Sequence, residues 1–348
     1  MGKFKKIFFF FSIILIYSCS NLRGPIPLTQ TTKVNGDADE CEFWIDKNDP
    51  TKSLLIGNDK KENGALYLWD LSGKLISKTE ALNEPVGVDV RYGMKLANRE
   101  IDIVVCALRS TNEIKIFEID PQNRKLIDIT TEKKIPSNFT KDTYGICLYK
   151  RPSDGKIFAF VSSKLKDNIH QIELKDDGFS KVEGSLVRSF GKNDQKSFVE
   201  GMLVDDDLGY VYFSDETSAI LKYVADPDKN DNSLILKFAT QDGIKGDREG
   251  LALYKKNQDT PYQDTGYLIL SSQGNSSFKI YQREGNNKFI KTISSLGVKN
   301  TDGIAATNAK IEPKYPNGLF AAHNSKGKNF VIYNWNEFFG DFLNKKSK

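Results

Sequence analysis

Two short patterns recur along this chain at nearly the same interval. Runs rich in β-branched and aromatic residues end at spacings of 48 to 58 residues, and turn signals such as Asp-Pro or Ser-Gly follow most of them closely. The six runs cover residues 65–69, 113–117, 168–172, 219–223, 278–281 and 330–333. A period of about fifty residues built from short strands predicts an array of similar units, each packed against its neighbours.

The second pattern is a glycine followed by an aliphatic residue, which opens an apolar strand before five of these runs: Gly87, Gly145, Gly201, Gly250 and Gly303. Two recurrences in phase favour a closed ring over a solenoid or a sandwich, and long helical stripes are nearly absent. We therefore predict an all-β, six-bladed β-propeller with four-stranded antiparallel blades around a central channel. The stretch around Trp44 is expected to pair with the last blade and close the ring.

The N-terminus resembles a bacterial export signal. Three lysines precede the apolar run 7–16, which is short for a membrane span, and Ile16-Tyr17-Ser18-Cys19 resembles a lipobox. We predict a lipoprotein-type signal peptide at 1–18, a lipidated Cys19, a tether at 19–35, the propeller at 36–340 and a polar tail at 341–348. The protein would then be exported and lipid-anchored to a bacterial membrane; an ordinary signal peptide cleaved slightly later is the alternative.

Charge and cysteine content argue against several other classes. The 50 Lys and Arg residues nearly balance the 46 Asp and Glu residues, and no basic arm or zinc-finger spacing appears, so we expect no nucleic-acid partner. GxSxG, P-loop and Cys-x5-Arg motifs are also absent from the sequence. Cys106 and Cys147 lie in apolar stretches and are predicted to be buried strand residues. We expect a monomer.

The residue before each of the last four recurrent glycines is expected to face the channel mouth: Tyr144, Glu200, Glu249 and Asp302. Carboxylates brought together in a partly desolvated channel raise one another's pKa, so either some are protonated or a multivalent cation lies among them. Carboxylate oxygens favour calcium or magnesium. Only two histidines are available, His170 and His323, and we expect His323 on the surface.

Basic residues follow three of the predicted strands, at Lys60-Lys61, Arg109 and Lys164. Each alone is consistent with a solvated surface charge. Their shared position at blade ends, beside the predicted cation site, instead favours an anionic substrate.

Several longer motifs add a family resemblance: Ser271-Ser-Gln-Gly-Asn-Ser-Ser277, Glu200-Gly-Met202, Asp247-Arg-Glu-Gly250 and Thr301-Asp-Gly-Ile304. With these, the chain from about Gly36 to Trp335 resembles the β-propeller phytase family. The resemblance implies a phosphomonoester hydrolase that depends on several calcium ions and acts on phytate (myo-inositol hexakisphosphate).

The resemblance also assigns roles by position. It implies catalytic or phosphate-binding roles for Lys60, Arg109, Tyr144, Lys164 and Glu216. It implies that calcium or its waters are held by Asp39, Glu40, Asp89, Glu200, Glu216, Asp247, Glu249, Gln273, Asp302 and Asn329. In this interpretation a calcium-bound water, oriented by acids such as Glu216, attacks phosphorus in line while the bases offset the developing charge.

The chain departs from the family pattern in places. Asp39-Glu40-Cys41 stands where paired aspartates and a proline are usual, Leu165 replaces an acid, and Ala322-His-Asn324 replaces a more acidic stretch. Two alternatives therefore stay open: a non-catalytic calcium-binding surface propeller that binds a ligand or partner, and a sugar-lactone hydrolase. The three bases favour the phosphatase, since neither alternative explains them.

Overall fold

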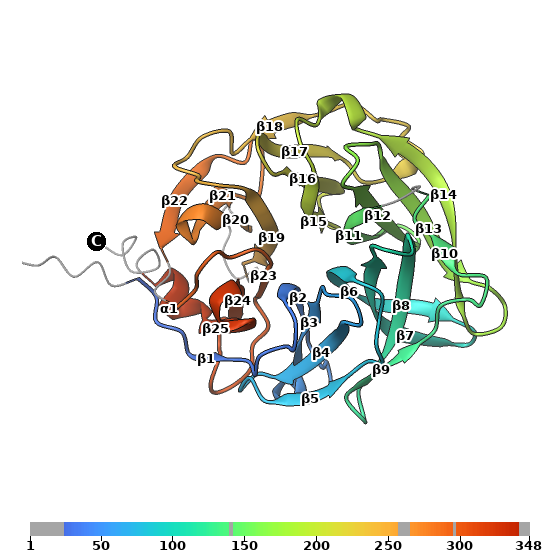
Figure 1. Ribbon diagram of the computed structural model, residues 1–348, viewed down its shortest axis with the longest axis horizontal. Helices are drawn as coiled ribbons and strands as arrows, with labels where there is room; N and C mark the ends of the chain where they lie inside the picture. The colour runs from blue at the N-terminus through green and yellow to red at the C-terminus, as the bar shows by residue number, and fades with distance from the viewer. Residues whose placement is uncertain (1–23, 139–141, 257–264, 295–296, 341–348) are drawn as a thin grey trace, which may run out of the picture.

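The computed structural model describes residues 24–138, 142–256, 265–294 and 297–340, which form a ring of six β-sheets (Figure 1). The predicted all-β, six-bladed propeller is confirmed. Within the described residues the one α-helix is α1 (Trp335–Phe339), which packs on blade 6. The other helical segments that the structure describes are short 3-10 turns between strands. No described helix has the length and apolar character needed to cross a membrane.

The blades follow one another in chain order. Blade 1 holds β2 (Ala38–Trp44), β3 (Leu54–Asp59), β4 (Ala65–Asp70) and β5 (Leu75–Lys78). Blade 2 holds β6 (Pro85–Leu96), β7 (Arg99–Leu108), β8 (Glu113–Asp120), β9 (Lys125–Asp128) and β10 (Ile135–Pro136). Blade 3 holds β11 (Thr143–Lys150), β12 (Ile157–Ser163), β13 (Ile169–Asp176) and β14 (Val182–Phe190).

Blade 4 holds β15 (Val199–Asp205), β16 (Tyr210–Asp215), β17 (Ala219–Val224) and β18 (Leu236–Phe238). Blade 5 holds β19 (Arg248–Lys255), β20 (Gly266–Ser272), β21 (Ser277–Gln282) and β22 (Phe289–Ser294). Blade 6 holds β23 (Ile304–Thr307), β24 (Leu319–Asn324), β25 (Asn329–Asn334) and β1 (Thr29–Gln30). The six aromatic runs of the sequence are the third strands, and the recurrent glycines lie in or directly before the first strands, which surround the channel.

The ring is closed by β1, not by the stretch around Trp44. Thr29 and Gln30 pair with Ile332 and Val331 of β25, whereas Trp44 lies in β2 and pairs with Leu54. The prediction was wrong on this point, because the C-terminus supplies three strands to blade 6 and the open edge of β25 is completed by residues that we had assigned to the tether. The predicted signal peptide, Cys19 and the tail at 341–348 lie outside the described residues.

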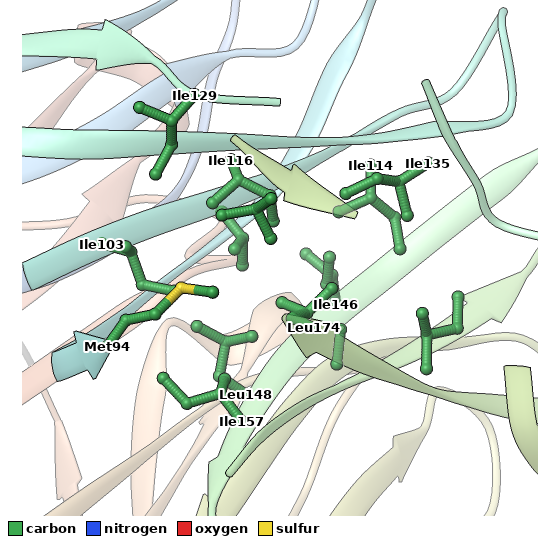
Figure 2. Packing of buried hydrophobic residues seen from close by; sticks show 14 of the residues in the cluster. Met94, Ile103, Ile114, Ile116, Ile129, Ile135, Ile146, Leu148, Ile157 and Leu174 are labelled. Carbon is green, nitrogen blue, oxygen red and sulfur yellow. The ribbon is translucent and has the colours of Figure 1, made fainter. Parts of the chain in front are cut away.

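Hydrophobic packing lies mainly between neighbouring blades. The described part of the chain contains six clusters of buried residues, and each one joins two adjacent sheets of the ring. Figure 2 shows the junction of blades 2 and 3, where Met94 and Ile103 face Ile146, Leu148 and Leu174. A blade buries little apolar surface by itself, so the closed ring is the unit that provides a core.

The cysteines take part in this packing. Cys106 and Cys147 are buried free thiols, as predicted, and so is Cys41. Burial raises the pKa of all three thiols, which keeps them in the unreactive protonated form.

Candidate active site at the channel mouth

An irregularity in the first strand of four blades aims a side chain at the channel mouth. The pairing of β2, β11, β15 and β19 with their neighbours shifts register at equivalent places, which are β-bulges. A bulge inserts an extra residue and turns a side chain out of the regular alternation. Asp39, Tyr144, Glu200 and Glu249 occupy these bulges, and Asp302 occupies the same place just before β23.

The recurrent glycine beside each of these residues allows the first strands to approach one another closely. A Cβ atom on Gly145 would lie 2.2 Å from the carbonyl oxygen of Glu200, and one on Gly201 would lie 2.2 Å from that of Glu249. Contacts this short are sterically forbidden, so a side chain would push the strands apart. In blade 1 the equivalent position is Glu40, so this blade contributes two acids to the mouth.

The mouth residues contact one another directly. Tyr144 Oη donates a hydrogen bond to Glu200 Oε2 at 2.5 Å, and Lys60 Nζ lies 2.7 Å from Asp39 Oδ1. Burial and the charge of Glu200 raise the pKa of Glu249. Lys60 therefore offsets part of the charge of this cluster.

Burial is the main cause of abnormal pKa values among these acids. Burial and the charge of Asp39 raise the pKa of Glu200 to about 7. Burial, together with neighbouring carboxylates, also raises the pKa of Glu40 and of Glu249 well above the usual range. These shifts agree with the sequence prediction that carboxyl groups from separate blades meet and disfavour one another's ionisation.

A second ring of polar residues lies at the first position after the second strand of every blade. In chain order these residues are Lys60, Arg109, Lys164, Glu216, Gln273 and Ser325. The first three are the predicted bases, and they come from three consecutive blades. This regular position could have been found in the sequence from the spacing of the blades alone.

The bases contact mouth residues or lie near them. Lys164 Nζ lies 4.2 Å from the centre of the Tyr144 ring, in a cation–π contact. Arg109 Nε lies 3.6 Å from Asp142 Oδ1, and the Arg109 side chain is about one-third exposed. Burial and the charge of Asp247 raise the pKa of Glu216, and the charge of Lys164 lowers it. One side of the mouth is therefore basic and the opposite side acidic.

The unpaired carboxylate oxygens of the mouth suit a calcium ion in their chemistry. Among the residues that the structure describes, four buried carboxylate oxygens have no hydrogen-bond partner: Asp39 Oδ2, Glu40 Oε1, Glu200 Oε1 and Glu249 Oε2. Oxygen atoms of this kind are the ligands that calcium prefers, and leaving them buried without a partner is unfavourable. Within the described residues no group of three or more His, Cys, Asp or Glu side chains is already arranged as a metal site. The donors fit calcium in chemistry, and binding would require their side chains to reorient.

Two predicted ligands, Asp89 and Asn329, already have hydrogen-bond partners. Asp89 accepts hydrogen bonds from Arg91 Nη1 at 2.8 Å and from the main-chain N–H of Leu148 at 2.7 Å. Asn329 is hydrogen-bonded to Asn324 and to the Thr31 carbonyl. Asp89 lines the channel cavity together with Glu40 and Glu200, and Arg91 offsets its charge there. Asn329 lies where β25 meets the N-terminal segment.

Asp247 and Gln273 lie at the edge of the cluster. Asp247 precedes β19, and its carbonyl accepts a hydrogen bond from the main-chain N–H of Gln273 at 3.2 Å. The side-chain amide of Gln273 donates to Asp302 Oδ1 at 2.7 Å. In this structure Gln273 orients a predicted ligand.

His323 was predicted on the surface, and this prediction was wrong. It lies in β24 with 1% of its surface exposed, next to Asp302. The error arose because the residue was judged by its polarity, whereas its position one residue before the end of the second strand directs it inward. The equivalent residues of the other blades, such as Asn58, Ser162 and Ser271, are also buried.

The channel below the mouth contains a cavity of about 300 Å³. Glu40 and Glu200 line it, and so do Glu42, Arg91 and Asp206. The sequence analysis did not single out Glu42 or Asp206. Glu42 lies in β2 and Asp206 directly follows β15, at positions that the recurrent sequence patterns do not mark.

A ring of six blades whose channel mouth joins buried carboxylates to three bases defines a propeller hydrolase of anionic substrates. The comparisons with known proteins make this class specific. The chain matches the Phytase family over residues 26–345 and is 33% identical over 328 residues to a 3-phytase of Bacillus subtilis (strain 168), with 89% of this chain and 83% of that protein covered. The chain belongs to the phytase family, and it is a phosphatase that hydrolyses phosphoric monoesters.

Solved structures share the fold at lower sequence identity. A putative phosphatase from Bacteroides thetaiotaomicron VPI-5482 superposes with a TM-score of 0.55 at 12% identity, covering 89% of this chain and 78% of that one. An auxiliary nutrient binding protein from the same organism gives a TM-score of 0.54 at 12% identity, covering 88% and 71%. At this level of identity the likeness supports the propeller fold alone.

Proposed function

We propose that this phosphatase hydrolyses phytate and depends on calcium held by the carboxylates of the channel mouth. The observation that carries the proposal is the set of four unpartnered, buried carboxylate oxygens beside three bases. The acids alone would repel an anionic substrate, whereas acids neutralised by calcium and flanked by Lys60, Arg109 and Lys164 would attract one. The similarity to a 3-phytase supports phytate as the substrate.

The calcium ligands that we propose are Asp39, Glu40, Glu200, Glu249 and Asp302, with Glu216 and Asp247 at the edge of the site. When bound there, calcium would supply positive charge toward the substrate and lower the pKa of a coordinated water. Lys60 would keep its contact with Asp39 while its remaining N–H groups face phosphate. Gln273 would hold Asp302, as its side-chain amide does in the present arrangement.

The residues of the mouth also suit the steps of hydrolysis. Arg109 and Lys164 bind phosphate oxygens and stabilise the charge that grows on them as the ester bond breaks. Glu216 is half-buried and has a raised pKa, so it is suited to accept a proton from the attacking water. Tyr144, bonded to Glu200 and covered by Lys164, keeps the two charged groups in place.

The test is phosphate release from phytate by the purified chain in calcium and after removal of calcium with EGTA. We expect release in calcium, loss of at least nine-tenths of it in EGTA, and recovery when calcium is added back. Equal release in both conditions would remove the calcium dependence. No release in either condition would favour a non-catalytic propeller.

A matched pair of variants tests the bases. Arg99 and Arg109 lie at opposite ends of β7, and Arg99 pairs with Glu118 away from the mouth. We expect Arg109→Ala to lower turnover at least tenfold with little change in Tm, and Arg99→Ala to keep its activity. Similar activity in both variants would withdraw the phosphate-binding role of Arg109.

We also propose that the protein is exported and anchored by lipid at Cys19, on the strength of the lipobox-like sequence. Metabolic labelling with a fatty acid is expected to mark the wild-type chain and to leave Cys19→Ala unmarked. Labelling of both chains would contradict the proposed anchor.

A further inference from the structure

His323 contacts Asp302 through one ring nitrogen. The main-chain N–H of Asp302 donates to His323 Nδ1 at 3.1 Å, and Asp302 Oδ2 lies 3.2 Å from the same atom. The ring is fully buried and lies against Phe330, so it has little freedom to leave this position. Nε2 is buried and has no hydrogen-bond partner in the described structure.

Other blades use the equivalent residue to fix the main chain of the channel bulges. Asn58 Oδ1 accepts from the N–H of Glu40, and Ser162 Oγ accepts from the N–H of Gly145. Ser214 and Ser271 donate to the carbonyls of Arg248 and Thr301, each of which precedes a mouth acid. The role of this position therefore recurs around the ring, and His323 occupies it in blade 6.

In blade 6 the contact reaches the acid itself. An imidazole nitrogen either accepts or donates, so Nδ1 satisfies the N–H or the carboxylate of Asp302 at any one time. When Nδ1 accepts the N–H, Asp302 Oδ2 is left without a hydrogen on the ring side and is available to a cation. Gln273 meanwhile holds Asp302 Oδ1 at 2.7 Å.

Asp302 also joins three blades through its main chain. The N–H of Gly250 donates to the carbonyl of Asp302, and the N–H of the following Gly303 donates to the carbonyl of Asp39. A shift of Asp302 would therefore move the channel strands of blades 5 and 1. A residue that fixes Asp302 acts on a junction of the proposed site.

We infer that His323 is a positioning residue, whose Nδ1 clamps the main chain of Asp302 so that its carboxylate faces the cation site. The inference rests on the proposed calcium-dependent function and extends it to a residue that touches neither substrate nor metal. Since His323 acts through Asp302, its loss is expected to weaken calcium binding more than it weakens the fold.

Two isosteric substitutions separate the ring nitrogens. In His323→Asn, the amide oxygen can take the place of Nδ1 and accept the N–H of Asp302, as Asn58 does for Glu40 in blade 1. In His323→Gln, the amide reaches the place of Nε2, and the acceptor at Nδ1 is lost. His323→Ala, which removes the side-chain acceptor altogether, serves if His323→Gln does not fold.

The measurement is the rise in Tm as calcium is added to the EGTA-treated chain, with phosphate release as a second readout. We expect His323→Gln, or His323→Ala, to need at least fivefold more calcium for half of the rise in Tm, and His323→Asn to stay within twofold of wild type. In an Asp302→Asn background, His323→Gln should have no further effect. His170→Gln, which alters a histidine in blade 3, is the control and should titrate as wild type does.

The outcomes distinguish this inference from the proposed function. A wild-type chain without any calcium response would remove the calcium-dependent function itself. If wild type responds to calcium and His323→Gln needs the same calcium concentration, only the role of His323 is removed. The same conclusion follows if the substitution changes only the Tm of the calcium-free chain.

Discussion

Lys60 shows how one side chain can serve both the stability and the chemistry of the mouth. Asp39 is fully buried, and its contact with Lys60 Nζ at 2.7 Å offsets its charge. Burial opposes the charge of Lys60, yet the nearby carboxylates, Asp39 first, raise its pKa. The cation therefore stays charged, and it remains exposed enough to meet a substrate.

Replacing Lys60 with methionine keeps the length of the side chain but removes the charge. We expect Lys60→Met to lower the free energy of unfolding in EGTA by about 1–3 kcal/mol, because the buried Asp39 carboxylate loses its cation. Calcium should restore most of this loss while activity stays at least tenfold lower. Urea unfolding with and without calcium measures the first effect and phosphate release the second.

Lys61 provides the control for this variant. Its side chain is 62% exposed and pairs with Asp37 at 3.3 Å. We expect Lys61→Met to change stability by less than about 0.5 kcal/mol, as is usual for a surface substitution. Equal losses in the two variants would show that Lys60 acts only as a surface charge.

The raised pKa of Glu200 predicts a pH dependence. Its pKa rises from 4.5 in the unfolded chain to about 7 in the folded chain, mainly through burial. The folded state then holds a proton that the unfolded state has lost, so stability falls as pH rises through this interval and levels off above it. We expect the calcium-free chain to lose about 2–3 kcal/mol of unfolding free energy over this range, and Glu200→Gln to lose less.

Urea unfolding in EGTA at a series of pH values measures this slope. Burial and the charge of Glu200 also raise the pKa of Glu249, so part of the slope should persist in the single variant. A slope in Glu200→Gln as steep as that of wild type would contradict the assignment.

Among the structural elements, the bulged first strand positions the site. It turns a polar side chain toward the mouth, and the neighbouring glycine lets the next blade approach. The two features depend on each other, since a bulge without the close approach would leave the carboxylates of separate blades too far apart to interact.

Gly201→Ala tests this arrangement. Its added methyl group would lie 2.2 Å from the carbonyl oxygen of Glu249, so β15 and β19 must separate. We expect a loss of about 2–4 kcal/mol in unfolding free energy, by overpacking, and a weaker calcium response. The check is denaturant unfolding together with a calcium titration of Tm.

Gly209→Ala is the comparison for this variant. Gly209 has φ +69° and no atom within 4 Å of an added Cβ, so the substitution strains the backbone without crowding the channel. A loss of about 1 kcal/mol with an unchanged calcium response is expected. If both variants keep the calcium response of wild type, the spacing of β15 and β19 does not control the site.

For the whole molecule, closure of the ring depends on a few residues at the N-terminus. Beyond the pairing of β1 with β25, Leu28 N–H donates to the carbonyl of Ile332 and Thr31 N–H to that of Phe330. Because the packing lies between blades, opening one junction exposes two sheets at once.

Removal of β1 is therefore expected to destabilise every blade together. We expect a chain that begins at Thr32 to lose about 2–4 kcal/mol of unfolding free energy relative to one that begins at Gly24, from the lost strand pairing and burial. Thermal unfolding should show one transition shifted to lower temperature. An unchanged Tm would contradict a role for β1 in closure.

The sequence by itself determined the architecture and most of the residues of the mouth. Period and phase are local properties, so the aromatic third strands and the glycine-bearing first strands could be counted without knowing any contact. The same counting placed Tyr144, Glu200, Glu249 and Asp302 at the channel, because a residue at a fixed place in a repeat occupies the same place in every blade.

Only the tertiary structure decided which partners these residues have. Sequence spacing does not reveal that Asp89 is paired with Arg91 or that Asn329 donates a hydrogen bond to the Thr31 carbonyl. It also does not reveal that His323 points inward and contacts Asp302. Ring closure by Thr29 and Gln30 was hidden for the same reason, since two residues carry too little pattern to indicate a strand. Pairing across the ring depends on contacts between residues up to about three hundred positions apart, such as Thr31 with Asn329, and a local pattern contains no information on them.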